Sequence, residues 1–303
     1  MKTTQDIRKI ITPTCSPSYE QKRRGLIGWL QMRTIKLLAQ LPPKIAQTVF
    51  LAFSGRNDDT RVVFNNVTTW KALEVMYTYQ ERRMKEKVGF GSRFWENFLD
   101  NARSIRNRLT LAKEELSQAI RKIDNDRELV HIVSIGSGSA RSVLETIEFF
   151  NGKSPQIKAL LIDSDQTAIE FSRRLARELD INGYTTRLTG NFFRLERDAA
   201  EFNPDVIELV GLLDYLTDKQ AIVLLGKAYR ILTIKGYLIT GNIAPNIEAP
   251  FVTKGINWPM IYRTPEELQA LLIEAGFSAK NVRLEQEPLG VHMVAIAQKL
   301  PNP

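Results

Sequence analysis

The residues best suited to chemistry follow a run of apolar residues, 130–135, that has the length of a β-strand. Five small residues come directly after it, and apolar side chains then recur every three or four residues over 143–150. The small residues are Gly136, Ser137, Gly138, Ser139 and Ala140. A strand, a glycine turn and a helix let the backbone approach a ligand closely, because glycine lacks the Cβ that would fill the ligand's space. The stretch predicts a turn that binds a nucleotide cofactor.

A second set of polar residues follows the apolar run 158–162. Asp163, Ser164 and Asp165 lie where this strand is expected to end. A carboxylate there can accept both hydrogen bonds of a ribose diol, whereas an acidic residue just before a helix can cap its first N–H groups. We assign Asp163, with the adjacent Ser164, to the ribose, and Asp165 to the cap of a helix that begins near residue 167.

Candidate binding residues also follow two other apolar runs, 185–188 and 206–210. They are Asn191 and Phe192 after the first run, and Gly211, Asp214 and Tyr215 after the second. An amide beside an aromatic ring can read the edge of an adenine and cover its face, although the ring can equally belong to the core. The glycine permits close approach of a ligand, and the aspartate and tyrosine put polar groups at the tip of a strand.

These runs belong to a region in which strands and helices alternate. The apolar runs are residues 132–135, 158–162, 185–188, 206–210, 237–240, 282–286 and 292–297, and the helical stretches are 139–150, 167–179, 218–232 and 265–275. This alternation predicts an α/β fold, with a mostly parallel sheet covered on both faces and ligands beyond the carboxyl ends of its strands. No helix separates the last two runs, which predicts a closing hairpin and an antiparallel last strand.

The first part of the chain has helical patterns. We expect helices near 21–40, 44–53, 69–87 and 92–123, after a partly ordered lead-in over 1–20 and with a polar loop at 56–59. Arg103, Arg106 and Arg108 fall on the polar face of the last helix. The chain therefore divides into an all-helical subdomain, residues 1–125, that acts as a lid or binds substrate, and an α/β domain, residues 126–303.

The net charge of +8 is concentrated in the first part of the chain. Residues 1–125 hold 23 Lys and Arg against 12 Asp and Glu, whereas the remainder holds 19 against 22. A basic region suits an anionic partner such as RNA, and the basic amphipathic stretch 21–40 is typical of a helix at a membrane surface. A solvated basic surface, or a helix packed against the rest of the protein, accounts for the same pattern.

Composition argues against several classes of protein. The single cysteine, Cys15, excludes an internal disulfide framework, and with two separated histidines it leaves too few ligands for a structural zinc. No apolar run approaches the ~20 residues of a membrane span, and the first residues lack the apolar core of a signal peptide. We expect a cytoplasmic protein without a metal, and the sequence indicates no particular oligomeric state.

In order and spacing, residues 128–300 resemble a class I S-adenosylmethionine-dependent methyltransferase. The turn at 136–140 is similar to the family's glycine motif, Asp163 matches the acid that holds the ribose, and Asn191 lies where the family places a residue near the adenine. The resemblance implies a Rossmann-like, seven-stranded sheet with a reversed last strand. It also implies methyl transfer with S-adenosylmethionine as the cofactor. The reversed ending argues against a nicotinamide dehydrogenase.

Two positions depart from the family's pattern. Ser134 stands two residues before the first glycine, where the family often has an acid that helps to place the methionine ammonium. Ala140 takes a place where glycine is common. Asp214 is one candidate to replace the missing charge. Arg106 or Arg108 can meet the cofactor's carboxylate, or both are ordinary surface residues.

The acceptor is expected to contact the segment 245–264, through Trp258, Tyr262 and Arg263. The guanidinium of Arg263 can hold an acceptor carboxylate bidentately, or it can form an ordinary ion pair with the glutamates just after it. A carboxylate acceptor needs no general base, whereas a hydroxyl or amine usually does. No residue is assigned as catalytic.

A second, fainter resemblance bears on the acceptor. Residues 211–216 and 258–264 look similar to bacterial methyltransferases that form fatty-acid methyl esters, which is a lead on the substrate class.

His131 lies within the first strand of the α/β region, and His292 begins the last strand. We expect a structural role for both.

Three functions remain open from the sequence. The first is methylation of a small or lipid-like acceptor under a helical lid. The second is an RNA methyltransferase whose basic helices hold phosphates. The third is a non-catalytic module that binds the cofactor and acts by interaction, for which Ser134 is the support.

Overall fold

The computed structural model describes residues 11–13, 19–52, 59–85, 90–124 and 128–301. Within these residues the chain forms one eight-stranded sheet in the order β1-β7-β8-β6-β5-β2-β3-β4. The strands are β1 (Ile11–Pro13), β2 (Leu129–Ile135), β3 (Gln156–Asp163), β4 (Thr185–Thr189), β5 (Val206–Leu209), β6 (Tyr237–Ile243), β7 (Val282–Gln286) and β8 (His292–Gln298). All neighbours pair in parallel except β8, which is antiparallel to both β6 and β7.

The seven predicted strands, β2 to β8, are confirmed, and so is the reversal of the last one. The short β1, which pairs with β7, adds an eighth strand. It lies in the stretch for which the sequence predicted only a lead-in, because three residues are too few to show a periodicity of two.

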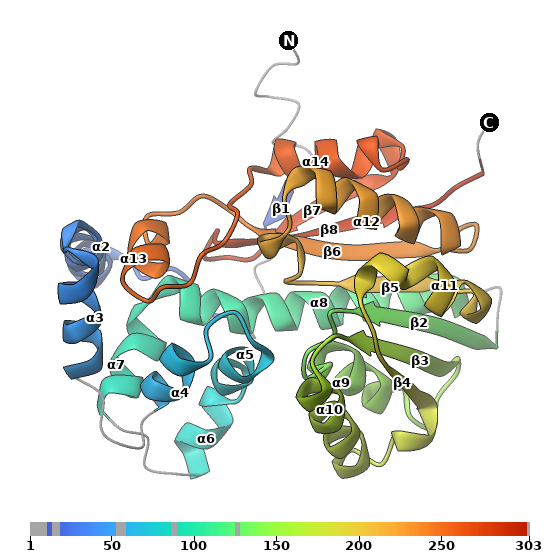
Figure 1. The fold of residues 1–303 in the computed structure, drawn as a ribbon, viewed down its shortest axis with the longest axis horizontal. Helices are drawn as coiled ribbons and strands as arrows, with labels where there is room; N and C mark the ends of the chain where they lie inside the picture. Colours follow the sequence, from blue (N-terminus) through green and yellow to red (C-terminus); the bar gives the residue numbers. More distant parts are fainter. Residues whose placement is uncertain (1–10, 14–18, 53–58, 86–89, 125–127, 302–303) are drawn as a thin grey trace.

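Helices cover both faces of the sheet (Figure 1). One face carries α9 (Arg141–Phe150), α10 (Gln166–Glu178) and the second half of the long α8 (Asp100–Asp124), and their apolar side chains form one core with the sheet. The other face carries α11 (Leu195–Ala199), α12 (Asp218–Ile231) and α14 (Pro265–Glu274), which form a second core. Such a sandwich is what alternating strands and helices predict.

The N-terminal helices gather beyond the carboxyl ends of the parallel strands (Figure 1). They are α2 (Gly25–Gln40), α3 (Pro43–Ala52), α4 (Asp59–Asn65), α5 (Trp70–Tyr77), α6 (Tyr79–Lys85) and α7 (Phe90–Phe98). Apart from α6, they bury a third core around Ile35, Ala72, Trp95 and Ile105, together with the first half of α8 and with α13 (Ala249–Lys254). The helical part therefore covers the edge of the sheet where ligands are expected.

Two of the helix predictions and the predicted polar loop need correction. The expected helix 92–123 is two helices, because the Glu248 carboxylate accepts hydrogen bonds from the backbone N–H groups of Asp100 and Asn101, at 2.8 Å each, and caps α8 there. The expected helix 69–87 is likewise two, divided at Thr78. Of the predicted polar loop, Asp59 begins α4, and the rest lies outside the described residues.

The predicted division of the chain at residue 125 separates neither the element types nor the packing, because the part predicted to be all-helical contains β1 of the sheet. Ala102 and Ile105 of α8 belong to the helical core, whereas Leu116 and Ile120 of the same helix belong to a core of the sheet. One continuous helix thus joins the two regions.

Candidate active site

The predicted glycine turn joins β2 to α9 at the carboxyl edge of the sheet. Gly136 and Gly138 have φ angles of +61° and +54°, which explains the glycines, and Ala140 also has a positive φ, of +55°. A Cβ on Gly138 would lie 3.3 Å from the Cβ of Trp70, the first residue of α5. The turn therefore lies directly under the helical region, with Ser137 and Ser139 beside the glycines.

Asp163, at the end of β3, is fixed by the backbone around it. Its carboxylate accepts hydrogen bonds from the N–H of Gly138, at 2.7 Å, and from the N–H of Asp165, at 2.8 Å. Burial raises the pKa of Asp163 above its usual value, and these backbone bonds oppose the shift. Asp165 caps α10 through the N–H of Thr167, in agreement with its predicted role, and Ser164 is exposed beside them.

The neighbouring strand β5 supplies an acidic side chain in place of the one that is missing at Ser134. Ser134 of β2 is paired with Glu208 of β5, so their side chains share one face of the sheet. The Ser134 hydroxyl donates a hydrogen bond of 2.6 Å to the Glu208 carboxylate, which lines the same pocket as the glycine turn. Burial raises the pKa of Glu208 above its usual value. The site thus holds a buried acid close to where the family's acid is expected.

Arg108 of α8 lies between this pocket and a second one, and it lines both. Its guanidinium donates to the Tyr77 hydroxyl, at 3.0 Å, and approaches the Asp214 carboxylate at 3.6 Å, while its Nε has no hydrogen-bond partner among the described residues. Gly211, with a φ of +91°, makes room for it, because a Cβ there would lie 3.0 Å from the guanidinium. Glycine at position 211 therefore leaves the space that the Arg108 guanidinium occupies.

The predicted surface position of the arginines is wrong. Arg103, Arg106 and Arg108 are all buried. The guanidinium groups of Arg103 and Arg106 are held by Glu20, and that of Arg106 is also held by Glu96. Only Arg108 of the three reaches the pockets.

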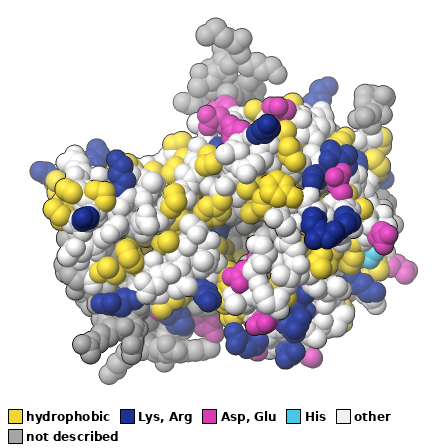
Figure 2. Space-filling view, in the orientation of Figure 1, with side chains coloured by type: hydrophobic (Ala, Val, Ile, Leu, Met, Phe, Trp, Pro, Cys, Tyr) yellow, Lys and Arg dark blue, Asp and Glu magenta, His cyan; other side chains and the backbone are white. Residues whose placement is uncertain are grey.

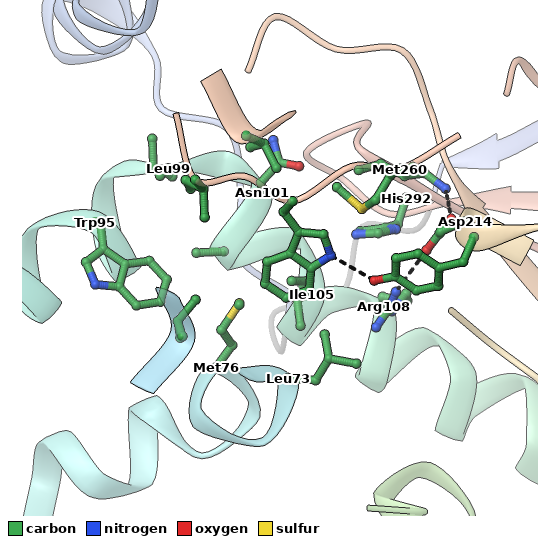
Figure 3. Close-up of a pocket in the computed structure, with 17 residues that line it drawn as sticks. Leu73, Met76, Trp95, Leu99, Asn101, Ile105, Arg108, Asp214, Met260 and His292 are labelled. Carbon is green, nitrogen blue, oxygen red and sulfur yellow. Dashed lines mark hydrogen bonds and ion pairs between the residues drawn. The ribbon is translucent and has the colours of Figure 1, made fainter. Parts of the chain in front are cut away.

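The second pocket lies between the helical region and the carboxyl edge of the sheet (Figure 3). We name it the acceptor pocket because it contains Trp258, which the sequence predicted to contact the acceptor. Its walls are mainly apolar and aromatic, and they include Leu73, Met76, Trp95, Leu99, Ile105, Val252, Ile256, Trp258 and Met260. Its polar side chains are Asn101, Arg108, Asp214, Tyr215 and His292. A pocket of this kind favours an apolar ligand with a few polar groups.

Asp214 and Tyr215 form part of the polar end of the acceptor pocket. The Asp214 carboxylate accepts a hydrogen bond of 2.8 Å from the N–H of Ile243, and burial raises its pKa. The Tyr215 hydroxyl accepts a bond of 2.8 Å from the indole N–H of Trp258, and burial raises the pKa of Tyr215 as well. Both residues therefore line the acceptor side, and Glu208 rather than Asp214 lies beside the glycine turn.

His292 also faces the acceptor pocket, although the sequence predicted a structural role. Because β8 runs antiparallel, its first residue pairs with Ile243 at the edge where the parallel strands end. The Nδ1 atom of His292 is buried and has no hydrogen-bond partner among the described residues. Burial, reinforced by the charge of Arg108, lowers the pKa of His292 well below its usual value. The imidazole is therefore neutral near pH 7.

The predicted role of Arg263 as a clamp for the acceptor is wrong. Its guanidinium makes five hydrogen bonds, to the side chains of Asp218 and Asn242 and to the carbonyls of Leu213 and Leu216. A guanidinium has five N–H donors, so none is left for a ligand. The alternative pairing with Glu266 or Glu267 is also replaced, by Asp218. Arg263 holds the loop after β5 to the end of β6.

Apart from Arg263, the predicted residues that lie outside the lining of both pockets are Ala140, Asp163, Ser164, Asn191, Phe192, Gly211 and Tyr262. Tyr262 packs on a small core around Leu289, with its hydroxyl 3.5 Å from that of Thr253. Asn191 accepts a hydrogen bond from the N–H of Phe193 and caps a short turn, and Phe192 packs partly against the core beneath α12. The adenine contact of Asn191 and Phe192 stays a prediction.

The sequence interpretation missed several residues of the site. Trp70 donates its indole N–H to Asp165 at 3.1 Å and lies over the glycine turn, and Tyr77 binds Arg108. Both follow helical spacing, which does not distinguish a pocket wall from a core. Glu208 did leave a signal, because it is a charged residue within the apolar run 206–210. Among the residues that the structure describes, no group of His, Cys, Asp or Glu is arranged to hold a metal ion.

The strand order, the reversed β8 and the glycine turn after β2 form the fold that the resemblance to S-adenosylmethionine-dependent methyltransferases predicted. Residues 67–299 match the model of a family described as "Putative methyltransferase", and the chain belongs to this family. The match includes α5 and α8 as well as the strands β2 to β8. No curated protein matches the sequence significantly.

Solved structures share the fold at low sequence identity. A "possible exported protein" from Bordetella parapertussis aligns with a TM-score of 0.65 and 17% identity, over 95% of this chain and 100% of that one. A "putative O-methyltransferase" from Nostoc punctiforme aligns with a TM-score of 0.52 and 15% identity, over 88% and 71%. Magnesium protoporphyrin IX methyltransferase from Synechocystis, with bound S-adenosylhomocysteine, aligns with a TM-score of 0.52 and 11% identity, over 75% and 96%.

Proposed function

We propose that this enzyme transfers the methyl group of S-adenosylmethionine to a small, largely apolar or lipid-like acceptor bound in the acceptor pocket. The observation that carries the proposal is the arrangement of two adjoining pockets that share Leu73 and Arg108. One pocket has the glycine turn and a buried acid, and the other is apolar with a polar end. Two ligands can therefore meet at Arg108.

The residues around the glycine turn fit S-adenosylmethionine. The turn leaves no Cβ at positions 136 and 138, where the cofactor must approach the backbone. Glu208 suits its ammonium and Arg108 suits its carboxylate, so the charges of the pocket match those of an amino acid. Asp163 can accept hydrogen bonds from the ribose hydroxyls, because two hydrogen bonds from backbone N–H groups already orient its carboxylate.

The cofactor supplies an activated methyl group, and the protein has to position the acceptor and exclude water. The apolar walls exclude water, and Asn101, Arg108 and His292 orient the polar end of the acceptor. His292 is neutral and its Nδ1 is unpartnered, so it can take the proton of an acceptor hydroxyl as a general base. Trp70 and α5 serve as the predicted lid over the glycine turn.

The structure gives less support to the second candidate function, an RNA methyltransferase. Two arginines of the basic helical region, Arg103 and Arg106, are buried in ion pairs with Glu20. The acceptor pocket is lined mainly by apolar side chains, whereas a nucleotide-binding groove is basic. The small-molecule acceptor is therefore the function that we favour.

Two measurements test the proposal. Calorimetry should detect binding of S-adenosylmethionine by the wild type and its loss in Asp163→Ala, and an absence of binding by the wild type contradicts the cofactor assignment. Mass spectrometry of cell extract incubated with the enzyme and deuteromethyl-labelled cofactor should then reveal a labelled acceptor of low molecular mass. Label that appears only in RNA contradicts the acceptor assignment.

A further inference from the structure

The outer surface of α2 combines exposed apolar residues with basic ones. We define the α2 face as Leu26, Ile27, Trp29, Leu30 and Leu37. Leu26 is 70% exposed, Ile27 63% and Leu37 60%, while Trp29 and Leu30 are about half exposed. A spacing of four and seven residues places Leu26, Leu30 and Leu37 on one line along the helix. Scattered exposed leucines are ordinary, but several apolar residues exposed on one side of a helix form a candidate binding surface.

The rotation of α2 about its axis is fixed by its opposite side. Gln31 is buried, and its side-chain amide donates to the carbonyl of Phe98 at 2.6 Å and to the Asp100 carboxylate at 2.9 Å. Ile35, one turn later, is 2% exposed in the helical core. Because these contacts hold the inner side of the helix, its apolar line must face outward.

The charged residues of α2 and α3 have one sign. Residues 21–52 include six Lys and Arg and no Asp or Glu. Arg33 and Lys36 are exposed on α2, and the Arg33 guanidinium lies 5.2 Å from the centre of the Trp29 ring. Figure 2 shows hydrophobic and basic side chains next to one another at the end of the molecule where α2 and α3 lie. Leucine and tryptophan among basic residues are typical of helices that lie in the interface of an anionic bilayer.

The position of α2 connects this surface to the acceptor pocket. α2 contacts α13, and the segment that includes α13 supplies Val252 and Ile256 to the wall of the pocket. On α3, Lys44 and the 51% exposed Ile45 extend the basic and apolar surface. Among the described helices, none has the length and apolar character needed to cross a bilayer, so contact through this surface would be peripheral.

We propose that the α2 face docks the protein on an anionic lipid bilayer. Its apolar side chains enter the boundary between headgroups and acyl chains, and Arg33, Lys36 and Lys44 meet the lipid phosphates. The proposal concerns binding alone and does not depend on the identity of the methyl acceptor. It would, however, place the wall of the acceptor pocket next to a source of lipid-like molecules.

Sedimentation of the full-length protein with lipid vesicles tests the proposal. We expect binding to vesicles of phosphatidylcholine with phosphatidylglycerol, and at least about tenfold weaker binding to phosphatidylcholine alone. Leu30→Glu combined with Leu37→Glu should weaken binding to the anionic vesicles by about tenfold or more. Ile273→Glu is the matched control, because Ile273 is an apolar residue of similar exposure, 44%, on α14, and it should leave binding unchanged.

Two further variants separate the apolar and the basic contributions. Arg33→Glu combined with Lys36→Glu should remove the preference for anionic lipid, which in the wild type also weakens as salt is added. Trp29→Phe should still bind, but it should lose the blue shift of tryptophan fluorescence that vesicles cause in the wild type. That shift would show that the α2 face itself enters the lipid.

Three results overturn the proposal. The first is no binding to anionic vesicles at low salt. The second is equal binding by the wild type and by the Leu30→Glu and Leu37→Glu double variant. The third is a dimer in sedimentation velocity that the same double variant dissociates, which would make the α2 face an interface between two copies of this chain.

Discussion

At the scale of single residues, the pair Glu208 and Arg108 explains how the site can work without the acid that Ser134 replaces. Glu208 reaches Ser134 from the adjacent strand, and Arg108 reaches the same pocket from α8. An acid and a guanidinium in one pocket complement the ammonium and carboxylate of an amino acid. This explanation leads to a direct prediction about the cofactor.

Glu208→Gln should weaken binding of S-adenosylhomocysteine by about 10- to 100-fold, the loss of one charge-assisted hydrogen bond. The same variant should bind methylthioadenosine as the wild type does, because that ligand lacks the amino-acid group. Calorimetry with both ligands measures the difference. Asp163→Ala is the control, since it should weaken both ligands. Equal losses for the two ligands in Glu208→Gln would show that Glu208 does not meet the ammonium.

A second residue-scale prediction concerns His292. If the acceptor is a hydroxyl, His292→Gln should lower kcat by about 10²- to 10⁴-fold, the usual contribution of a general base, with a smaller effect on KM. Because burial lowers the pKa of His292, the wild-type kcat should not change with pH above the ordinary histidine range and should fall only in acid. Steady-state kinetics over pH measures both effects. An unchanged kcat in the variant means that the acceptor oxygen arrives already ionised.

At the scale of elements, α7 and α8 are joined by a buried carboxyl and guanidinium pair, Glu96 and Arg106, that makes stability depend on pH. Burial raises the pKa of Glu96 on α7 to about 8, from 4.5 in the unfolded chain, even though Arg106 of α8 lies beside it. The folded protein therefore holds a proton that the unfolded chain releases. The stability that this proton contributes is complete below about pH 4.5 and is lost as the pH rises through about 8.

We therefore expect the free energy of unfolding to fall between about pH 5 and about pH 8, by at most about 1.4 kcal/mol per pH unit from this group. Glu96→Gln, which keeps an acceptor for Arg106, should flatten the decline. Urea denaturation of both proteins at several pH values measures it. A decline of equal slope in Glu96→Gln would assign the pH dependence to other groups.

The elements that the sequence predicted are those with local signals. The strands from β2 to β8 and the helices between them follow apolar periodicity, and the cap of α10 follows from Asp165 two residues before Thr167. The break between α7 and α8 could not be predicted, because its cap comes from Glu248, which is 148 residues away from Asp100. The prediction of the site failed for the same reason. Arg263 and Arg108 look like ordinary basic residues in the sequence, because only the fold brings their partners close to them.

At the scale of the whole molecule, α8 makes the helical part and the sheet depend on each other. Leu111, Leu116 and Ile120 lie in the core that covers one face of the sheet. A fragment that begins at residue 128 lacks these side chains and exposes that face. We expect this fragment to fail to unfold cooperatively, measured by circular dichroism on heating.

The control for the fragment is Leu116→Ala in the full chain, which should lose about 2–5 kcal/mol of stability yet still unfold in one transition. A fragment that is folded and binds S-adenosylhomocysteine would show instead that residue 125 is a true domain boundary.

Arg108, which lines both pockets, has a consequence for the order of events in a catalytic cycle. A ligand that draws its guanidinium into one pocket changes what the other pocket offers, so the two ligands bind with a coupling free energy. That coupling is reciprocal: the factor by which the cofactor changes the affinity for the acceptor is also the factor by which the acceptor changes the affinity for the cofactor. After methyl transfer the spent cofactor still carries its amino-acid group. If both ligands bind as proposed, the release of the two products is linked through the side chain of Arg108, which lines both pockets.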